Sequence, residues 1–162
     1  MNEVKRMFHV GPNGVQFGVI QYSDEVSRQF TLSQCSSVAG LEVAVDSIRR
    51  KRGASRTGEA LGSKIQVFAD TACSNVPWYL IVVTSGKSVD LGADAAEALR
   101  GHGVTIYAVG VRDANIVELQ EIAEDRMFFV RDFESLKAIQ QEVVQDICSS
   151  ESKNFFLQSH SL

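Results

Sequence analysis

Trp78–Thr84 is an uninterrupted run of apolar and β-branched residues. A strand with one solvated face alternates apolar and polar residues, whereas a strand buried on both faces does not, so this run predicts a central strand of a parallel sheet. Val104–Val109 has the same character and follows a Gly101–Gly103 stop signal. A doubly wound α/β domain, with helices on both faces of a mostly parallel sheet, is therefore the expected fold.

Strands and helices are predicted to alternate along the rest of the chain. A turn at Gly11–Gly14 leads into a strand over Val15–Ser23, and Val26–Leu32 returns beside it as an antiparallel edge hairpin. Apolar residues at helical spacing then predict several helices, with a short strand before the last of them. The helices are expected over Val38–Lys51, Ala60–Ala69, Ala95–Leu99, Asn115–Ala123 and Phe133–Cys148, and the short strand at Met127–Val130.

Residues 1–148 are expected to form one domain, and the Ser-rich segment 149–162 a linker or a disordered tail. The composition, with 44% hydrophobic residues, is that of a globular chain. A net charge of −4 gives no overall positive electrostatic potential that would attract nucleic acid. No apolar run approaches the roughly 18 residues that span a bilayer, and no signal pattern begins the chain. We therefore expect neither a nucleic-acid partner nor membrane insertion.

Two groups of residues leave their roles open. The three cysteines, Cys35, Cys73 and Cys148, have neither metal-ligand spacing nor an even count, so their pairing is not assigned. The basic run Arg49, Arg50, Lys51 and Arg52 is expected to place cations at the C-terminus of a helix. It is also the candidate contact for weak, salt-sensitive binding of polyanions such as glycosaminoglycans.

Catalytic motifs are incomplete. Ser85 follows a core strand as a hydrolase nucleophile does, but Val83 and Lys87 stand where a nucleophile elbow has glycines. No histidine is placed by sequence near Ser85, and no phosphate-binding loop is present. Asp90 and Asp94 are expected to stabilise the N-terminal dipole of a helix, not to bind metal. The chain is therefore predicted not to be an enzyme.

Four segments in succession resemble the von Willebrand factor type A domain family. They are Gly14–Ser23, Thr57–Leu61, Leu80–Ser88 and Gly103–Val111, and a final helix starting near Phe133 completes the match. The resemblance covers Gly11 to Cys148 and is greatest to the N-terminal A domains of collagen VI α chains. It implies an extracellular, noncatalytic adhesion module of the matrix.

In metal-dependent members of this family, a divalent cation lies at the top of the sheet, in the metal-ion-dependent adhesion site (MIDAS). The resemblance assigns it an Asp-x-Ser-x-Ser loop, a hydroxyl near Thr57 and an Asp after the strand that ends at Thr84. This sequence has no such loop, and Ser85 occupies the Asp position. The remaining positions, Ser55, Thr57 and Ser85, carry no charge, so we expect a degenerate site without metal or another cofactor.

The predicted partners are other matrix proteins or neighbouring A domains. The alternative is the A domain of a metal-dependent adhesion receptor, which would require Asp at position 85. The resemblance also implies that the family's first strand is missing here. Because that strand would lie between Val15–Ser23 and Trp78–Thr84, its absence predicts a gap of unpaired backbone groups, each costing about 1–3 kcal/mol, and a marginally stable domain.

Overall fold

The computed structural model describes residues 9–11, 13–32, 34, 37–49, 51, 53–71, 77–132, 134–149 and 154–160, with only the backbone described at 65–71, 148–149 and 154–160. Strands and helices alternate as predicted. In chain order they are β1 (Gln16–Tyr22), β2 (Val26–Phe30), α2 (Val38–Asp46), α3 (Thr57–Thr71), β3 (Trp78–Thr84), α4 (Ala93–Gly101), β4 (Val104–Val111), α5 (Ile116–Ala123), β5 (Met127–Val130), α6 (Leu136–Ser149) and β6 (Asn154–His160).

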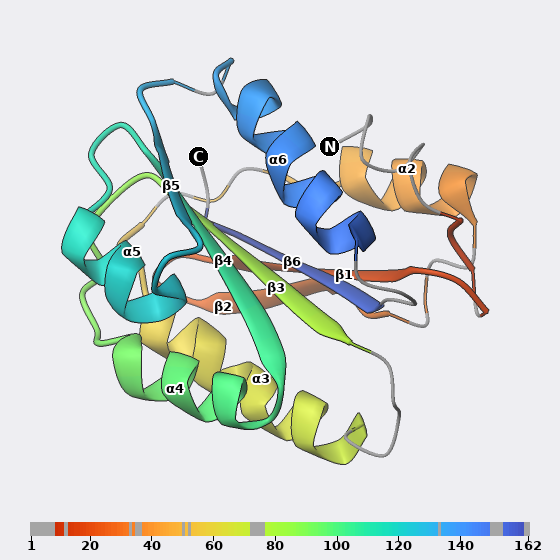
Figure 1. Ribbon diagram of the computed structural model, residues 1–162, viewed down its shortest axis with the longest axis horizontal. Coiled ribbons are helices and arrows are strands. Elements are labelled where there is room, and N and C mark those ends of the chain that lie inside the picture. The colour runs from red at the N-terminus through yellow and green to blue at the C-terminus, as the bar shows by residue number, and fades with distance from the viewer. Residues whose placement is uncertain are drawn as a thin grey trace.

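The strands form one six-stranded sheet in the order β2-β1-β6-β3-β4-β5. Only the β1–β2 pair at one edge is antiparallel, and the other neighbours run parallel. Helices α2 and α6 cover one face of the sheet, while α3, α4 and α5 cover the other (Figure 1). The predicted doubly wound α/β class, with its antiparallel edge hairpin, is therefore confirmed.

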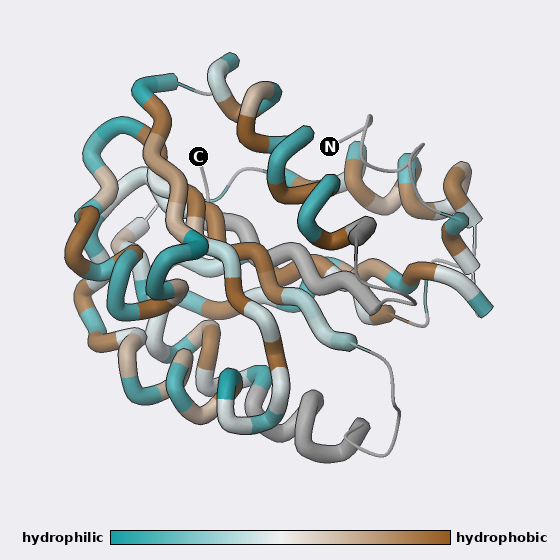
Figure 2. Tube along the Cα trace, in the orientation of Figure 1, coloured by the Kyte–Doolittle hydropathy of each residue, from teal (hydrophilic) through white to brown (hydrophobic). Residues whose placement is uncertain are grey.

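Each face of the sheet packs against its own apolar core. Successive residues of a strand point to opposite faces, so Val19 and Ile81 belong to the core under α2 and α6, whereas Ile20 and Leu80 belong to the core over α3, α4 and α5. Apolar colouring runs along the central strands, and hydrophilic colouring appears on the helices (Figure 2). Burial on both faces is the reason that the strand sequences read as continuous apolar runs.

The expected linker or disordered tail at 149–162 is wrong for Asn154–His160, which form β6 in the middle of the sheet. β6 pairs in parallel with β1 from Gln16 to Tyr22 and with β3 from Trp78 to Val83. The predicted gap between these strands is thus filled, and the argument for marginal stability from an open gap falls with it. The Phe155-Phe156-Leu157 run was the sequence signal for this strand, because it is apolar and aromatic within a polar segment.

The helix expected over Val38–Lys51 ends earlier, at Asp46. Ser47 is its C-cap: the Ser47 N–H still donates to the Val43 carbonyl as in a helix, but the Ser47 hydroxyl donates to the Ala44 carbonyl, 2.7 Å away. A serine that hydrogen-bonds back to its own helix competes with continuation of the helix. The last turn of α2 therefore contains no basic residue, and the predicted role of the basic run as helix-terminal cations is wrong. No helix among the described residues is long and apolar enough to span a bilayer.

A glycine in β4 gives a direct test of this packing. A Cβ added at Gly110 would lie 2.4 Å from Leu119 Cδ1 and 2.9 Å from Ala114 Cβ, so we expect Gly110→Ala to reduce the free energy of unfolding by about 1–3 kcal/mol. Gly62 in α3 is the matched control, because nothing lies within 4 Å of its added Cβ. Gly62→Ala should stabilise the fold by about 0.5–1 kcal/mol, and urea unfolding of both variants measures the contrast. Equal effects of the two substitutions would contradict the packing described.

Candidate functional site

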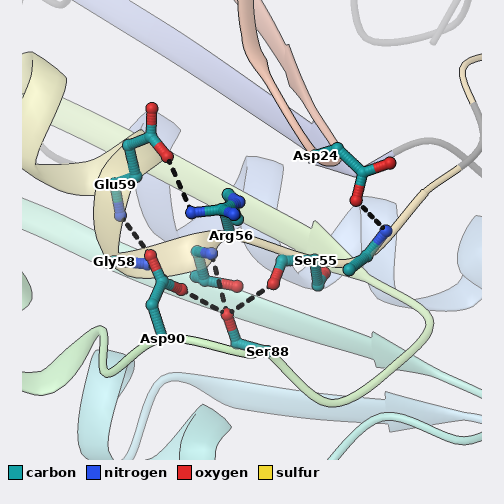
Figure 3. A network of polar contacts seen from close by, with 9 residues as sticks. Asp24, Ser55, Arg56, Gly58, Glu59, Ser88 and Asp90 are labelled. Carbon is teal, nitrogen blue, oxygen red and sulfur yellow. Dashed lines mark hydrogen bonds and ion pairs between the residues drawn. The ribbon is translucent and has the colours of Figure 1, made fainter.

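The candidate site lies at the carboxyl edge of the parallel sheet, where the loop after β3 meets the segment that leads into α3. Ser55 and Ser88 form an isolated parallel bridge between the two segments, and the Val89 N–H donates to the Ser55 carbonyl at 2.8 Å. The Asp24 carboxylate, in the turn after β1, accepts from the Ala54 N–H at 2.8 Å (Figure 3). Three segments distant in sequence are thereby held at one edge, which is where binding sites of open α/β sheets form.

The structure brings two of the three predicted hydroxyl positions into a buried cluster. Ser55 and Thr57 are both buried, and Ser55 Oγ lies 3.5 Å from the hydroxyl of Thr84, the last residue of β3. Ser85 follows Thr84 in the chain but is only half-buried. The contacts described for this edge do not join Ser85 to Ser55 or Thr57, so the three positions do not converge through direct hydrogen bonds.

Ser88 is the centre of the hydrogen-bond network at this edge, and the sequence analysis did not identify it. Its hydroxyl accepts from the Thr57 N–H at 2.9 Å and has the Asp90 carboxylate at 2.6 Å and the Ser55 carbonyl at 3.1 Å. A hydroxyl has one proton, and the shorter, charged acceptor attracts it more strongly, so we assign the donation to Asp90. Ser88 therefore connects the start of α3 to the loop after β3.

Asp90 binds the N-terminus of α3. Its two carboxylate oxygens accept from the N–H groups of Gly58 and Glu59, at 3.0 and 2.7 Å (Figure 3). Burial would raise the pKa of Asp90, but the hydrogen bonds from Ser88, Glu59 and Gly58 outweigh it and hold the pKa below its ordinary value. The expectation that Asp90 stabilises a helix terminus is confirmed, although it caps α3, which precedes it, and not α4, which follows. Asp94 lies in the first turn of α4.

Glu118, in the first turn of α5, is a second carboxylate that the sequence analysis did not assign. Its Oε2 accepts from the Ser88 N–H at 2.9 Å. Burial raises the pKa of Glu118, and the hydrogen bonds from Ser88 and Thr57 oppose that rise only in part. The geometry at Thr57 is poor, because Thr57 Oγ1 and Glu118 Oε1 are buried without a well-formed hydrogen bond among the described residues. Tyr22 lies in the same cluster, and burial raises its pKa as well.

These groups do not fit a divalent cation. Magnesium and calcium need several oxygen ligands, usually with charge among them. Both oxygens of Asp90 are committed to the α3 terminus, and Glu118 lies where burial disfavours its charged form. Within the described parts of the chain, no group of three or more His, Cys, Asp or Glu side chains is placed to hold a metal. Asp90 and Glu118 organise the neighbouring segments instead, as Asp24 does through the Ala54 N–H.

Only Arg49 and Lys51 of the basic run lie among the residues that the structure describes. Arg49 is exposed, and the Lys51 ammonium donates a hydrogen bond to the Ser27 hydroxyl on β2. Arg50 and Arg52 lie outside the described residues, as do Cys35 and Cys73. Because Lys51 already has a protein partner, Arg49 is the clearer candidate for polyanion contact. Weak glycosaminoglycan binding by this run stays a prediction.

Because folding lowers the pKa of Asp90, the contribution of this side chain to the free energy of unfolding should decrease as the pH falls. A carboxylate whose pKa falls on folding contributes its full stabilisation at pH values above its pKa in the unfolded chain, which is about 3.9. This stabilisation is lost as the pH drops through the pKa of the carboxylate in the folded protein. We expect Asp90→Asn, which retains one acceptor oxygen, to cost about 1–2 kcal/mol at neutral pH and almost nothing at the acid limit. Urea unfolding across the acid range measures the difference. Asp94→Asn, at an exposed site in α4, is the control, and an equal loss there would contradict the capping role.

Comparison with known proteins agrees with this fold. The von Willebrand factor type A domain model matches residues 1–142. The collagen alpha-4(VI) chain of Mus musculus is 55% identical over 94% of this chain, which spans 7% of that protein. Matrilin-2 of Mus musculus is 34% identical over 87% of this chain, which spans 16% of that protein.

Solved structures agree as well. Proximal thread matrix protein 1 from the mussel byssus, with a zinc-occupied MIDAS motif, matches with a TM-score of 0.83 and 29% identity, covering 91% of this chain and 39% of that one. The curated relatives are secreted extracellular-matrix proteins, which agrees with the predicted location and the predicted class of interaction module. Since the family model covers most of the sequence, the chain belongs to the von Willebrand factor type A domain family.

Proposed function

We propose that this chain is a noncatalytic matrix-interaction module that contacts partner proteins through apolar side chains at the carboxyl edge of its sheet, without a bridging cation. The observation that carries the proposal is a set of exposed apolar residues on the loop after β3 and on the first turn of α5, which are joined by the hydrogen bond between Ser88 and Glu118. They are Val89, Leu91, Ile116 and Val117, exposed by 63, 84, 50 and 62%, and we call them the apolar rim.

The segments that carry the apolar rim contact one another. Val89 follows Ser88 and Val117 precedes Glu118, and Ser88 and Glu118 are hydrogen-bonded at 2.9 Å. The backbone of Leu91 lies close to the start of α3, as shown by the 2.2 Å that would separate a Cβ added at Gly58 from the Leu91 carbonyl oxygen. Single exposed apolar residues are ordinary on a protein surface, whereas neighbouring ones mark interaction sites. The partners that suit this surface are other matrix proteins or neighbouring A domains.

Two observations support the noncatalytic part of the proposal. His9 and His102 lie just before β1 and β4, at the amino edge of the sheet, whereas Ser85 follows β3 at the carboxyl edge. A seven-residue strand separates its ends by about 20 Å at roughly 3.3 Å per residue, which is too far for His9 or His102 to reach Ser85. His160 does end β6 at the carboxyl edge, one position beyond the Val83–Ser159 pair, so the argument against a nucleophile at Ser85 is there the missing elbow glycines, whose positions Val83 and Lys87 occupy. Both oxygens of Asp90 accept from backbone N–H groups, and Glu118 accepts from one with its other oxygen buried, so neither of these two side chains is presented to a substrate.

Calorimetry distinguishes this proposal from the metal-dependent receptor alternative. We expect no micromolar binding of Mg²⁺ or Mn²⁺ to the folded chain, because the neutral hydroxyls of Ser55, Thr57 and Ser85 lack a charged partner free to ligate. Ser85→Asp, which restores the family's acidic position, is the comparison variant. Micromolar binding by the unsubstituted chain that Ser85→Ala abolishes would favour the receptor alternative instead.

The apolar rim is tested by binding of the labelled chain to the decellularised matrix of cultured fibroblasts. We expect Leu91→Ser combined with Val117→Ser to weaken binding about tenfold, since an interface anchor contributes about 1–2 kcal/mol, and we expect EDTA to have no effect. Val43→Ser is the matched control, because Val43 is 72% exposed but lies on α2, which covers the opposite face of the sheet from α5. Equal losses for Val43→Ser and the rim variant, or binding abolished by EDTA, would count against the proposal.

A further inference from the structure

Cations from separate parts of the chain meet at the edge strand β2, which in the described sheet pairs only with β1. Arg28 lies in the middle of β2 and is exposed. The Lys51 ammonium donates a hydrogen bond to the hydroxyl of Ser27, the residue before Arg28. Arg49 is exposed as well, and the two-residue separation places its Cα within about 7 Å of the Lys51 Cα. The segment between α2 and α3 therefore adds its positive charges to that of β2.

These cations lie on both sides of the edge strand. Arg28 is paired with Ile20 across β2 and β1, and side chains paired across antiparallel strands lie on the same face of a sheet. Ile20 belongs to the core over α3, α4 and α5, so Arg28 lies on that face. Ser27, the preceding residue, points to the opposite face, where its hydroxyl accepts from Lys51. An elongated ligand that lies along β2 can thus reach Arg28 and Lys51 together.

Helix α3 places a further cation near Arg28. Lys64 is 2% exposed, and burial lowers its pKa to about 8, with a smaller contribution from the charge of Arg28. That contribution shows that positive charges on β2 and α3 lie close enough to repel each other, and an anion bound beside Arg28 would relieve the repulsion. Ion pairs between described residues involve neither Arg28 nor Arg49. Within that part of the chain, no carboxylate neutralises either guanidinium through an ion pair.

The surface around these cations suits a polar polyanion better than a protein. Among the described residues, none of the exposed large apolar side chains lies on β2 or between α2 and α3. Protein–protein interfaces usually have an apolar centre, which this edge does not offer. Sulfate groups require only charge and N–H donors, and a guanidinium provides both. Because the chain resembles secreted matrix proteins, a sulfated polysaccharide is a more accessible polyanion than a nucleic acid.

We propose that Arg28, Arg49 and Lys51 form a binding site for a sulfated glycosaminoglycan at the β2 edge, and we call these three residues the cationic edge. Arg28 adds to the basic run a cation that lies outside it in sequence. Lys64 adds to the positive potential without direct contact, because it is buried. The net charge of the chain is −4, so the attraction is local and sensitive to salt. The cationic edge is separate from the apolar rim, since β1 and β6 lie between β2 and β3.

Binding of a fluorescent heparin octasaccharide to the full chain at low ionic strength, measured by anisotropy, tests the cationic edge. Arg28→Gln should weaken binding about three- to tenfold and reduce the slope of log affinity against log salt by about 1, because one cation is lost from the contact. Arg131→Gln is the matched control, since Arg131 is an exposed arginine that follows β5, at the opposite edge of the sheet. It should change neither affinity nor slope. Equal losses in the two variants, or no binding by the unsubstituted chain, would overturn the proposal.

The chemistry of the ligand is tested with two other probes. The same octasaccharide without its sulfate groups should bind about tenfold more weakly, because fewer counterions are released. A polyglutamate peptide of equal charge should also bind more weakly than the sulfated octasaccharide. If the desulfated octasaccharide or polyglutamate binds as tightly as the sulfated octasaccharide, the site does not recognise sulfate and the proposal is wrong.

The location of the site can be checked without a substitution. Titration of the unsubstituted chain with the octasaccharide should shift the amide NMR signals of β2 and of residues 49 and 51, and shifts centred on β5 would contradict the cationic edge. The variant with Leu91→Ser and Val117→Ser should bind the octasaccharide as the unsubstituted chain does. A loss of octasaccharide binding in that variant would place the site at the apolar rim instead, so the two proposals fail independently.

Discussion

Backbone pairing of β6 with β1 on one side and with β3 on the other is the constraint on which the rest of this structure depends. β6 contributes a donor and acceptor ladder on each side, and without it the β1–β2 hairpin and the β3–β4–β5 sheet would present two open edges inside the protein. Both apolar cores extend across β6, since each includes residues of β1 together with residues of β3 and β4. The helices can pack on a continuous sheet only because β6 lies between β1 and β3.

Most of the fold could be predicted because its signals are local. Burial on both faces made Trp78–Thr84 and Val104–Val109 continuous apolar runs, and helical spacing identified the helices between them. β6 was missed because a short apolar run in a polar, Ser-rich setting is no stronger evidence for a strand than for a solvated tail. Its role comes from two partners more than seventy residues away in sequence, and pairing at that distance leaves no local pattern.

The candidate site shows the same limit at the level of side chains. Ser55 and Thr57 were predicted to lie at this edge, and they do, but the residues that organise it are Ser88, Asp90 and Glu118. The parallel topology places the ends of β3 and the start of α3 together, so Ser88 and Asp90 could have been expected there. What the sequence could not show is that both oxygens of Asp90 are occupied by α3, because that depends on the path of the loop after β3.

The commitment of these carboxylates has a physical consequence for binding. A loop whose polar groups are satisfied internally has fewer conformations to lose when a partner arrives, so its exposed apolar side chains are presented at a lower entropic cost. Ser88 and Glu118 hold the loop after β3 against α5, and Asp90 holds it against α3. In a metal-dependent site the polar groups at this edge would bind the cation, whereas here Asp90 and Glu118 accept hydrogen bonds from the backbone segments beside the apolar rim. Recognition at such an edge depends on shape and apolar contact, and the charged groups act by fixing that shape.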